Sequence, residues 1–133
     1  MKTLITIIAL ACLPFVTHAQ AQQSQNDGLS RQFTTCMDRS GGVTMDIIEC
    51  ISAEAQRQDD QLNQAYQALR ADLSPERKKQ LLEAQRAWIK FRDTNCDFYY
   101  DPDGGTLARV MANDCVMQMT AKRARELEGL KGL

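Results

Sequence analysis

From residue 44 onward, apolar residues recur along this chain at helical spacing. Between residues 48 and 73 they are separated by three, four or seven positions, so they fall on one face of a helix. This predicted buried face comprises Ile48, Ile51, Ala55, Leu62, Tyr66, Leu69 and Leu73. Thr44 can cap the start of the helix, and Asp46 and Glu49 suit the positive end of its dipole. The pattern therefore predicts a first long helix that begins at Thr44.

A helix boundary follows at Ser74, Pro75 and Glu76. These residues supply an N-cap, a proline at the first helical position, where its missing amide proton costs nothing, and an early acid. We expect a second helix from there to about Tyr99. Its apolar stripe consists of Leu81, Ala84 or Gln85, Trp88, Phe91 and Asn95, with Leu82, Ile89 and Cys96 at its edges.

A turn is expected at residues 101–105, which comprise two aspartates, a proline and two glycines. Thr106 can then cap a third helix. Its predicted buried face comprises Leu107, Val110, Met111, Met117, Ala121, Ala124, Leu127 and Leu130. Three amphipathic helices with short connections predict an all-α fold, an antiparallel bundle of three long helices. A short N-terminal helix or extended arm over residues 31–38 should lie across one end of the bundle.

The first 21 residues have the three parts of a cleavable signal peptide. Lys2 provides a positive charge, residues 4–16 are apolar, and Ala19 and Ala21 each offer a cleavage site. The apolar stretch is shorter than the roughly 20 residues that a membrane span needs, and no later segment is apolar enough. We therefore expect a periplasmic or secreted protein without stable membrane insertion. Residues 22–28 should be a disordered polar N-terminus, and residues 29–133 a single helical domain.

Cys12 leaves a lipid anchor open, because the residues before it loosely resemble a lipidation signal. The apolar run continues beyond Cys12, however, where a lipoprotein would normally turn polar, and this favours simple cleavage. The two outcomes differ in where the mature chain begins.

The mature chain carries little net charge and no histidine. Removal of the leader takes Lys2 and His18 with it, which leaves 15 basic against 17 acidic residues. This balance gives no electrostatic reason to expect nucleic acid or anionic lipid as a partner. Without a mature histidine, and with oxidised cysteines, the chain lacks the usual histidine-assisted nucleophiles. We therefore expect a protein that acts by binding, not an enzyme, and we expect no cofactor.

Four cysteines remain in the mature chain, and four cysteines allow three pairings. Cys36 and Cys50 flank a chain reversal at residues 40–42, and Cys96 and Cys115 flank the predicted turn. Pairing each cysteine with its nearer neighbour in this way is the expected solution. By loop closure, each bridge would stabilise the fold by about 3 kcal/mol. The alternative is a zinc site of four thiolates, but such cysteines usually come in closely spaced pairs, and secretion favours disulfides.

The order and spacing of many residues in the predicted helices are similar to those of a known family. The residues that carry this resemblance are Asp59, Leu62, Asn63, Tyr66, Gln85, Trp88, Ile89, Phe91, Arg92, Asp93, Cys96, Gly104, Gly105, Cys115, Thr120, Arg123 and Leu127. Together they resemble the lysozyme inhibitor LprI-like N-terminal domain family, whose members are small exported bacterial domains. The resemblance covers roughly residues 36–130. It implies a helical exported domain and, for some members, inhibition of lysozyme.

Several polar and aromatic residues fall on or beside helix faces that look inward. They are Asp59, Asn63, Tyr66, Trp88, Arg92 and Arg123. An acid that faces an arginine across two helices would form a bidentate pair, so we expect a structural polar network that fixes the helix register. A ligand site is the alternative.

The connection before the third predicted helix is the candidate partner-binding site. It carries Asp97, Tyr99, Tyr100, Asp101 and Asp103. Tyrosines flanked by acids can anchor a cationic partner and steer its approach, and the predicted disulfide nearby would clamp the base of the loop. The acids could instead attract calcium, but the chain lacks the ligand spacing of a helix-loop-helix calcium site. The remaining alternative is an ordinary polar connector.

We therefore expect a binding protein that inhibits lysozyme by occluding the enzyme cleft. The alternative partner is another envelope protein, for which this chain would serve as an interaction or stress-related scaffold without inhibiting an enzyme. Exposed glutamines on the first long helix would suit that role, namely Gln56, Gln58, Gln64 and Gln67. The sequence leaves the oligomeric state open.

Overall fold

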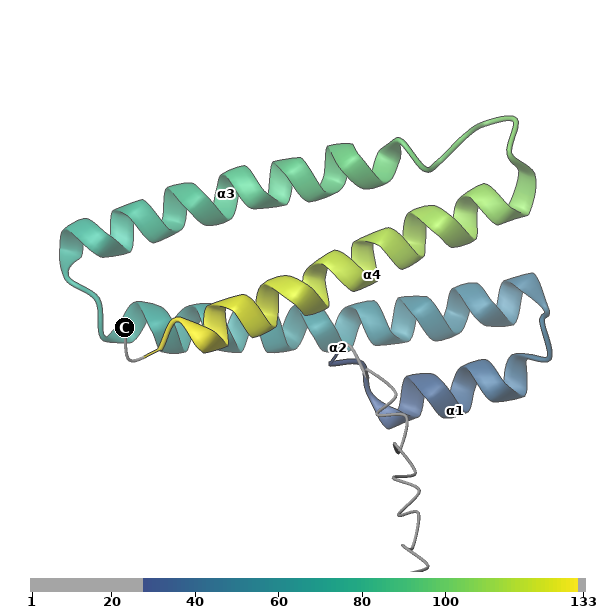
Figure 1. The fold of residues 1–133 in the computed structure, drawn as a ribbon, viewed down its shortest axis with the longest axis horizontal. Helices are drawn as coiled ribbons and strands as arrows, with labels where there is room; N and C mark the ends of the chain where they lie inside the picture. Colours follow the sequence, from purple (N-terminus) through teal and green to yellow (C-terminus); the bar gives the residue numbers. More distant parts are fainter. Residues whose placement is uncertain (1–27, 132–133) are drawn as a thin grey trace, which may run out of the picture.

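The computed structural model describes residues 28–131, and within them the chain forms four α-helices and no strand. The helices are α1 (Arg31–Ser40), α2 (Thr44–Ala71), α3 (Pro75–Asp97) and α4 (Gly105–Gly129) (Figure 1). The all-helical fold predicted from the sequence is confirmed. The predicted leader over residues 1–21, with its Cys12, and residues 22–27 of the predicted polar N-terminus lie outside the described residues. The single helical domain over residues 29–133 stays a prediction.

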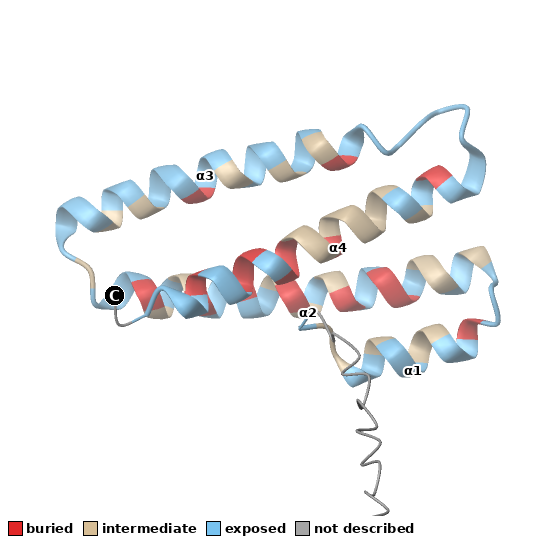
Figure 2. Ribbon diagram, in the orientation of Figure 1, coloured by how far each residue is buried: buried red, intermediate tan, exposed pale blue. Residues whose placement is uncertain are grey.

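The hydrophobic core lies between α2 and α4, which pack along each other. Figure 2 shows the buried residues concentrated where these two helices meet. The central cluster consists of Leu62, Ala65, Leu69, Ala124 and Leu127, with Tyr66, Leu73, Leu81 and Trp88 packed against it. Most of this cluster belongs to the two apolar faces that the sequence predicted. The amphipathic pattern therefore identifies the centre of the core correctly. The predicted buried face of α4 is wrong at Leu107, Met111 and Leu130, which are exposed because they lie beyond the stretch of α4 that packs on α2.

Helix α3 contributes much less to the core than the other two long helices. Over its whole length only Gln85 and Cys96 are buried, and it packs mainly against α4 (Figures 1 and 2). Phe91, predicted as part of the buried stripe, is 59% exposed. The three long helices are thus present in the predicted order, but α3 is packed less closely than α2 and α4. Part of the inward side of α3 is polar, because Gln85, Arg92 and Asn95 lie there beside the apolar side chains that reach the core.

The helix boundaries follow the local sequence signals only in part. Ser74 caps α3 as predicted, because its Oγ accepts a hydrogen bond from the amide of Arg77. Thr44 is the first residue of α2 and not its cap. Helix α4 begins one residue before Thr106, since Gly104 takes the N-cap position. The expectation that Thr106 caps this helix is therefore wrong.

The N-terminal element is a helix and not an extended arm. Helix α1 lies beside the first half of α2 and packs against it, instead of lying across one end of the bundle (Figure 1). Ser30 caps α1 by accepting a hydrogen bond from the amide of Phe33 at 3.1 Å. Gly41 ends α1 with a φ of +56°, which a residue without a side chain adopts readily. The chain can therefore reverse within a few residues and bring α1 back onto α2.

Two disulfides reinforce the contacts between neighbouring helices. Cys36 bonds to Cys50 across α1 and α2, with 5.6 Å between their Cα atoms, and Cys96 bonds to Cys115 across α3 and α4, with 5.5 Å. This is the local pairing expected from the sequence, and it leaves no free thiolates among these four cysteines for the alternative zinc site. The second bridge belongs to α3, the long helix with the fewest buried residues. Among the described residues, no helix is both long and apolar enough to cross a membrane.

Candidate functional site

The predicted partner-binding residues lie together in the connection between α3 and α4. Asp97 is the last residue of α3, and Tyr99, Tyr100, Asp101 and Asp103 follow it, all exposed. The two tyrosines keep 41% and 49% of their surface exposed. Their amides donate to the carbonyls of Cys96 at 3.1 Å and Asp97 at 3.0 Å, so the chain continues as a turn beyond the end of the helix.

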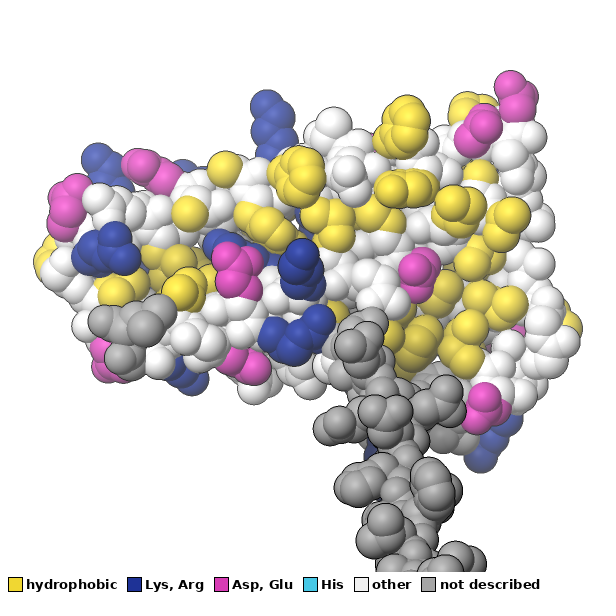
Figure 3. Space-filling view, viewed as in Figure 1, with side chains coloured by type: hydrophobic (Ala, Val, Ile, Leu, Met, Phe, Trp, Pro, Cys, Tyr) yellow, Lys and Arg dark blue, Asp and Glu magenta, His cyan; other side chains and the backbone are white. Residues whose placement is uncertain are grey.

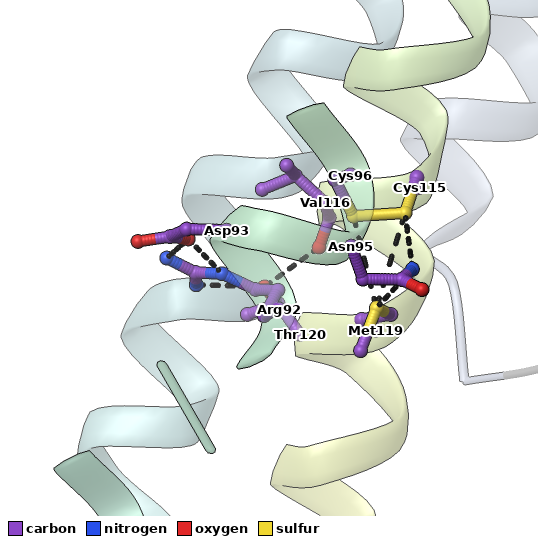
Figure 4. Close-up of a disulfide and its surroundings, with 8 residues drawn as sticks. All are labelled: Arg92, Asp93, Asn95, Cys96, Cys115, Val116, Met119 and Thr120. Atoms are coloured by element: carbon purple, nitrogen blue, oxygen red, sulfur yellow. Dashed lines mark hydrogen bonds and ion pairs between the residues drawn. A yellow bond between two sulfur atoms is a disulfide. The ribbon is translucent and has the colours of Figure 1, made fainter. Parts of the chain in front are cut away.

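Hydrogen bonds within the loop and a crosslink at its base give it a defined shape. The amide of Asp103 donates to Oδ1 of Asp101 at 2.9 Å, and the amide of Gly104 donates to the carbonyl of Asp101 at 3.0 Å. Just before the loop, the Cys96–Cys115 disulfide joins α3 to α4 (Figure 4). The loop is therefore a tight turn on a covalently fixed base.

Phe98 is a feature of this loop that the sequence-based prediction missed. Its side chain is 85% exposed, and its ring lies edge-on to that of Tyr99, with 6.2 Å between the ring centroids. Three consecutive aromatic residues are thus presented to solvent at the end of α3. Phe98 lies seven residues after Phe91, which the sequence placed on a buried stripe, so helical spacing gave no sign that Phe98 is exposed.

The charge of the loop is wholly negative. Residues 97–106 contain three aspartates and no basic residue. Within residues 28–131, none of these three carboxylates forms an ion pair. The same part of the chain contains no cluster of three or more acidic, histidine or cysteine side chains arranged to hold a metal ion, so the calcium alternative gains no support. The carboxylates can instead attract a cationic partner.

Two arginines of the predicted polar network lie against Trp88. The guanidinium of Arg92 is 5.2 Å from the centroid of the Trp88 ring, and that of Arg123 is 5.8 Å from it. Arg92 also donates to Oγ1 of Thr120 at 3.2 Å (Figure 4). Arg123 donates to Oε1 of Gln85 at 3.0 Å. These contacts connect α3 to α4.

The other predicted members of the network lie elsewhere. Asp59 accepts a hydrogen bond from Asn63 at 3.0 Å on the same helix, and Tyr66 packs against the core. Among the described residues, Asp59 pairs with neither arginine; Arg92 pairs with Asp93 and Arg123 with Glu126, each on its own helix. The expected bidentate pair across helices is therefore absent from this part of the chain. Nearby acids on the same helices satisfy the two arginines.

A buried carboxylate in α2 is a second feature that the sequence-based prediction missed. Glu54 is 0% exposed and accepts hydrogen bonds from the amide of Ser30 at 2.8 Å, Nε of Arg57 at 2.7 Å and Nε2 of Gln58 at 2.7 Å. Gln58, predicted to be exposed, is buried and also donates to the carbonyl of Gly28 at 3.0 Å. This cluster ties the start of the described chain to α2.

The hydrogen bonds around Glu54 control its ionisation. Burial alone raises the pKa of this carboxyl, but the hydrogen bonds from Ser30, Gln58 and Arg57 outweigh burial and hold the pKa below its ordinary value. Glu54 is therefore ionised at neutral pH. Its position four residues before Gln58, both on the apolar face of α2, is the sequence signal for a buried polar pair.

An open groove of about 820 Å³ lies along α1 and the start of α2, away from the loop. Arg31 and Arg39 line it from α1, and Asp46 and Glu49 line it from α2. None of the predicted partner-binding residues lies in this groove, although the Cys36–Cys50 disulfide borders it. Its walls carry opposite charges, so it has no single electrostatic preference.

Comparison with known proteins identifies the family. The family model described as Lysozyme inhibitor LprI matches residues 36–127. This range includes both disulfides, the α3–α4 loop, and Trp88 with the two arginines that lie against it. The chain belongs to the LprI lysozyme inhibitor family. A curated relative is an uncharacterized protein of Rhizobium meliloti (strain 1021), which is 28% identical over 100 residues, or 65% of this chain and 72% of the relative. No solved structure matches the chain significantly.

Proposed function

We propose that this LprI family member is an exported binding protein that inhibits a lysozyme by placing its α3–α4 loop over the substrate cleft. Membership of the LprI family over residues 36–127 is the observation that carries the proposal. The form of the loop supports it, because the loop is exposed, acidic and held on a disulfide. The protein acts by occupying a surface, and no catalytic role is assigned to any of its residues.

The loop combines a steering charge with apolar anchors. Its three carboxylates, which form no ion pair within the described part of the chain, attract a cationic enzyme and speed the encounter. Phe98, Tyr99 and Tyr100 then supply large side chains of the type that dominates interface energies. Because the disulfide fixes the end of α3 before binding, the loop loses little conformational freedom in the complex.

The two disulfides support a location outside the cytoplasm, because such bonds persist in oxidising compartments. We propose that residues 1–21 form a signal peptide and that cleavage after Ala19 or Ala21 releases the chain into the periplasm or the medium. Mass spectrometry of the exported protein tests this directly. An N-terminus at residue 20 or 22 is expected, and a retained leader would contradict the proposal.

The inhibitory role is tested by the rate at which lysozymes of different classes lyse bacterial cell walls. The oxidised mature protein should slow lysis by at least one class. The variant Asp101→Asn with Asp103→Asn should be less potent, whereas Asp60→Asn, at an exposed acid on α2, should match the wild type. Equal potency of the two variants would show that the loop carboxylates do not contribute to inhibition.

The groove along α1 and α2 favours a second candidate function, in which the chain binds another envelope protein without inhibiting an enzyme. The groove lies apart from the loop, and its size is sufficient for a segment of another chain. A protein with this function would leave cell-wall lysis unchanged at every concentration. Substitution of Arg31 and Arg39 by glutamine should then abolish capture of the envelope partner, while substitutions in the loop should not.

A further inference from the structure

The seam between α3 and α4 carries a groove that extends well beyond the loop. Two shallow hollows of about 240 and 270 Å³ lie along it and share Met119. Phe91 and Lys122 line the first hollow, and Met111 and Asp114 line the second, which also reaches Tyr99 at the edge of the loop. We refer to these two hollows together as the Met119 groove.

Several apolar side chains that line the Met119 groove are exposed. Phe91 is 59% exposed, Met111 46% and Tyr99 41%. Figure 3 shows hydrophobic side chains gathered over α3 and α4 on the face that it draws. Exposed apolar side chains gathered in one band are typical of an interaction surface. The sparse packing of α3 suits such a surface, because a partner would supply neighbours that the chain itself lacks.

The charges of the groove are arranged symmetrically about its centre. Asp114, Gln118 and Lys122 are spaced by four residues and so share one face of α4. Asp114 lines one hollow and Lys122 lines the other. Arg123 and Glu126 also line the hollow of Lys122, but they form an ion pair at 2.9 Å and their charges offset each other. Within residues 28–131, neither Asp114 nor Lys122 takes part in an ion pair. The groove therefore has an acidic half and a basic half on either side of Gln118.

This arrangement is self-complementary. A two-fold axis that crosses α4 near Gln118 would place Asp114 of each copy opposite Lys122 of the other. The same axis would carry each exposed Phe91 toward the hollow beside Met111 of the other copy. A symmetric dimer interface uses one patch twice, so it requires a patch that is complementary to itself. A partner of one charge sign would match only half of the groove.

We infer that the protein forms an antiparallel two-fold dimer through the Met119 groove. The occupant of the groove is a second copy of this chain. Tyr99 reaches the groove and would be covered in the dimer, whereas Phe98, Tyr100, Asp101 and Asp103 do not line it, so the dimer presents two acidic loops. The inference does not depend on the proposed function, because dimerisation is measured without any lysozyme.

Sedimentation equilibrium of the oxidised mature protein over a wide concentration range tests the inference. The wild type should approach the mass of two protomers. Lys122→Glu and Asp114→Lys should each weaken dimerisation by about tenfold or more, because each places like charges opposite one another twice. An equimolar mixture of the two variants should dimerise again, since the mixed dimer pairs each introduced charge with its opposite.

Matched controls separate this effect from net charge and from misfolding. Lys79→Glu and Asp60→Lys make the same charge changes at exposed positions that do not line the groove, and they should dimerise like the wild type. Circular dichroism should show that all four variants are folded. A wild type that keeps the mass of one protomer at every concentration overturns the inference. A mixture of Lys122→Glu and Asp114→Lys that dimerises no better than either variant alone also overturns it.

Discussion

The side chain of Arg123 in α4 donates through Nε to Oε1 of Gln85 in α3 at 3.0 Å, and both residues are buried. This hydrogen bond connects α4 to the one long helix that has little apolar packing. Together with the two arginines over Trp88 and the Cys96–Cys115 disulfide, it holds α3 against α4. The position of the loop therefore depends on polar and covalent contacts more than on the hydrophobic core.

Removal of the Gln85 carbonyl should destabilise the protein. Gln85→Ala leaves the buried guanidinium of Arg123 without one acceptor, and we expect a loss of about 1–3 kcal/mol in the free energy of unfolding. Urea unfolding followed by circular dichroism measures this loss. Gln64→Ala on the exposed side of α2 is the control and should change stability little. A similar small effect for both variants would show that the buried hydrogen bond is unimportant.

The two disulfides should differ in what they protect. Replacement of either cysteine pair by serine should cost about 3 kcal/mol by loop closure. Loss of the Cys96–Cys115 bridge should also raise amide hydrogen exchange at the end of α3, because this bridge is the covalent link between that end and α4. Loss of the Cys36–Cys50 bridge should leave exchange in that region unchanged. Equal exchange at the end of α3 in both variants would contradict this division.

Glu54 should make stability depend on pH in the acid range. Because its pKa is lower in the folded chain than in the unfolded one, its contribution is fully present above the ordinary carboxyl value and is lost as the pH falls through the lowered one. Glu54→Gln should lack this part of the acid dependence and be less stable at neutral pH. The free energy of unfolding, measured from pH 7 downward for the wild type and Glu54→Gln, tests this expectation. Glu49→Gln, at an exposed site, is the control. If the stability of wild type and Glu54→Gln changed with pH in parallel, Glu54 would not be the source of the acid dependence.

The sequence predicts the covalent and local features of this fold well. The start of α3 at Ser74 and Pro75 follows from capping chemistry, and the disulfides follow from short loops between neighbouring helices. Helical periodicity also identifies the core of α2 and α4. These features depend on residues that are close in sequence, or on a strong apolar face.

Features that depend on the distance between helices could not be predicted in the same way. The periodic pattern places Phe91 on the apolar face of α3, but it does not show how far α3 lies from the core. The exposure of Phe91 was therefore not predicted. The partner of a charged residue is equally hard to predict, since Arg92 and Arg123 pair with acids on their own helices and not with Asp59. The candidate loop could be located from its composition, but the exposure of Phe98 required the structure.

Tyr100 should be an anchor of the complex with lysozyme. Its side chain is half exposed in the free protein, and its burial against the enzyme would make Tyr100→Ala at least about tenfold weaker in affinity. Surface plasmon resonance at low and high salt should show that this variant dissociates faster without a change in salt dependence. Asp101→Asn should instead slow association at low salt. The reverse pattern would contradict the division of the loop into anchors and steering charges.

Contact between the α3–α4 loop and lysozyme can be detected by amide hydrogen exchange in the complex. Exchange should be compared between the free oxidised protein and the protein saturated with lysozyme. We predict that protection increases in residues 98–106 and stays unchanged in α1 and the first half of α2. Protection confined to α1 and α2, or no change anywhere at saturating enzyme, would show that the α3–α4 loop does not contact lysozyme.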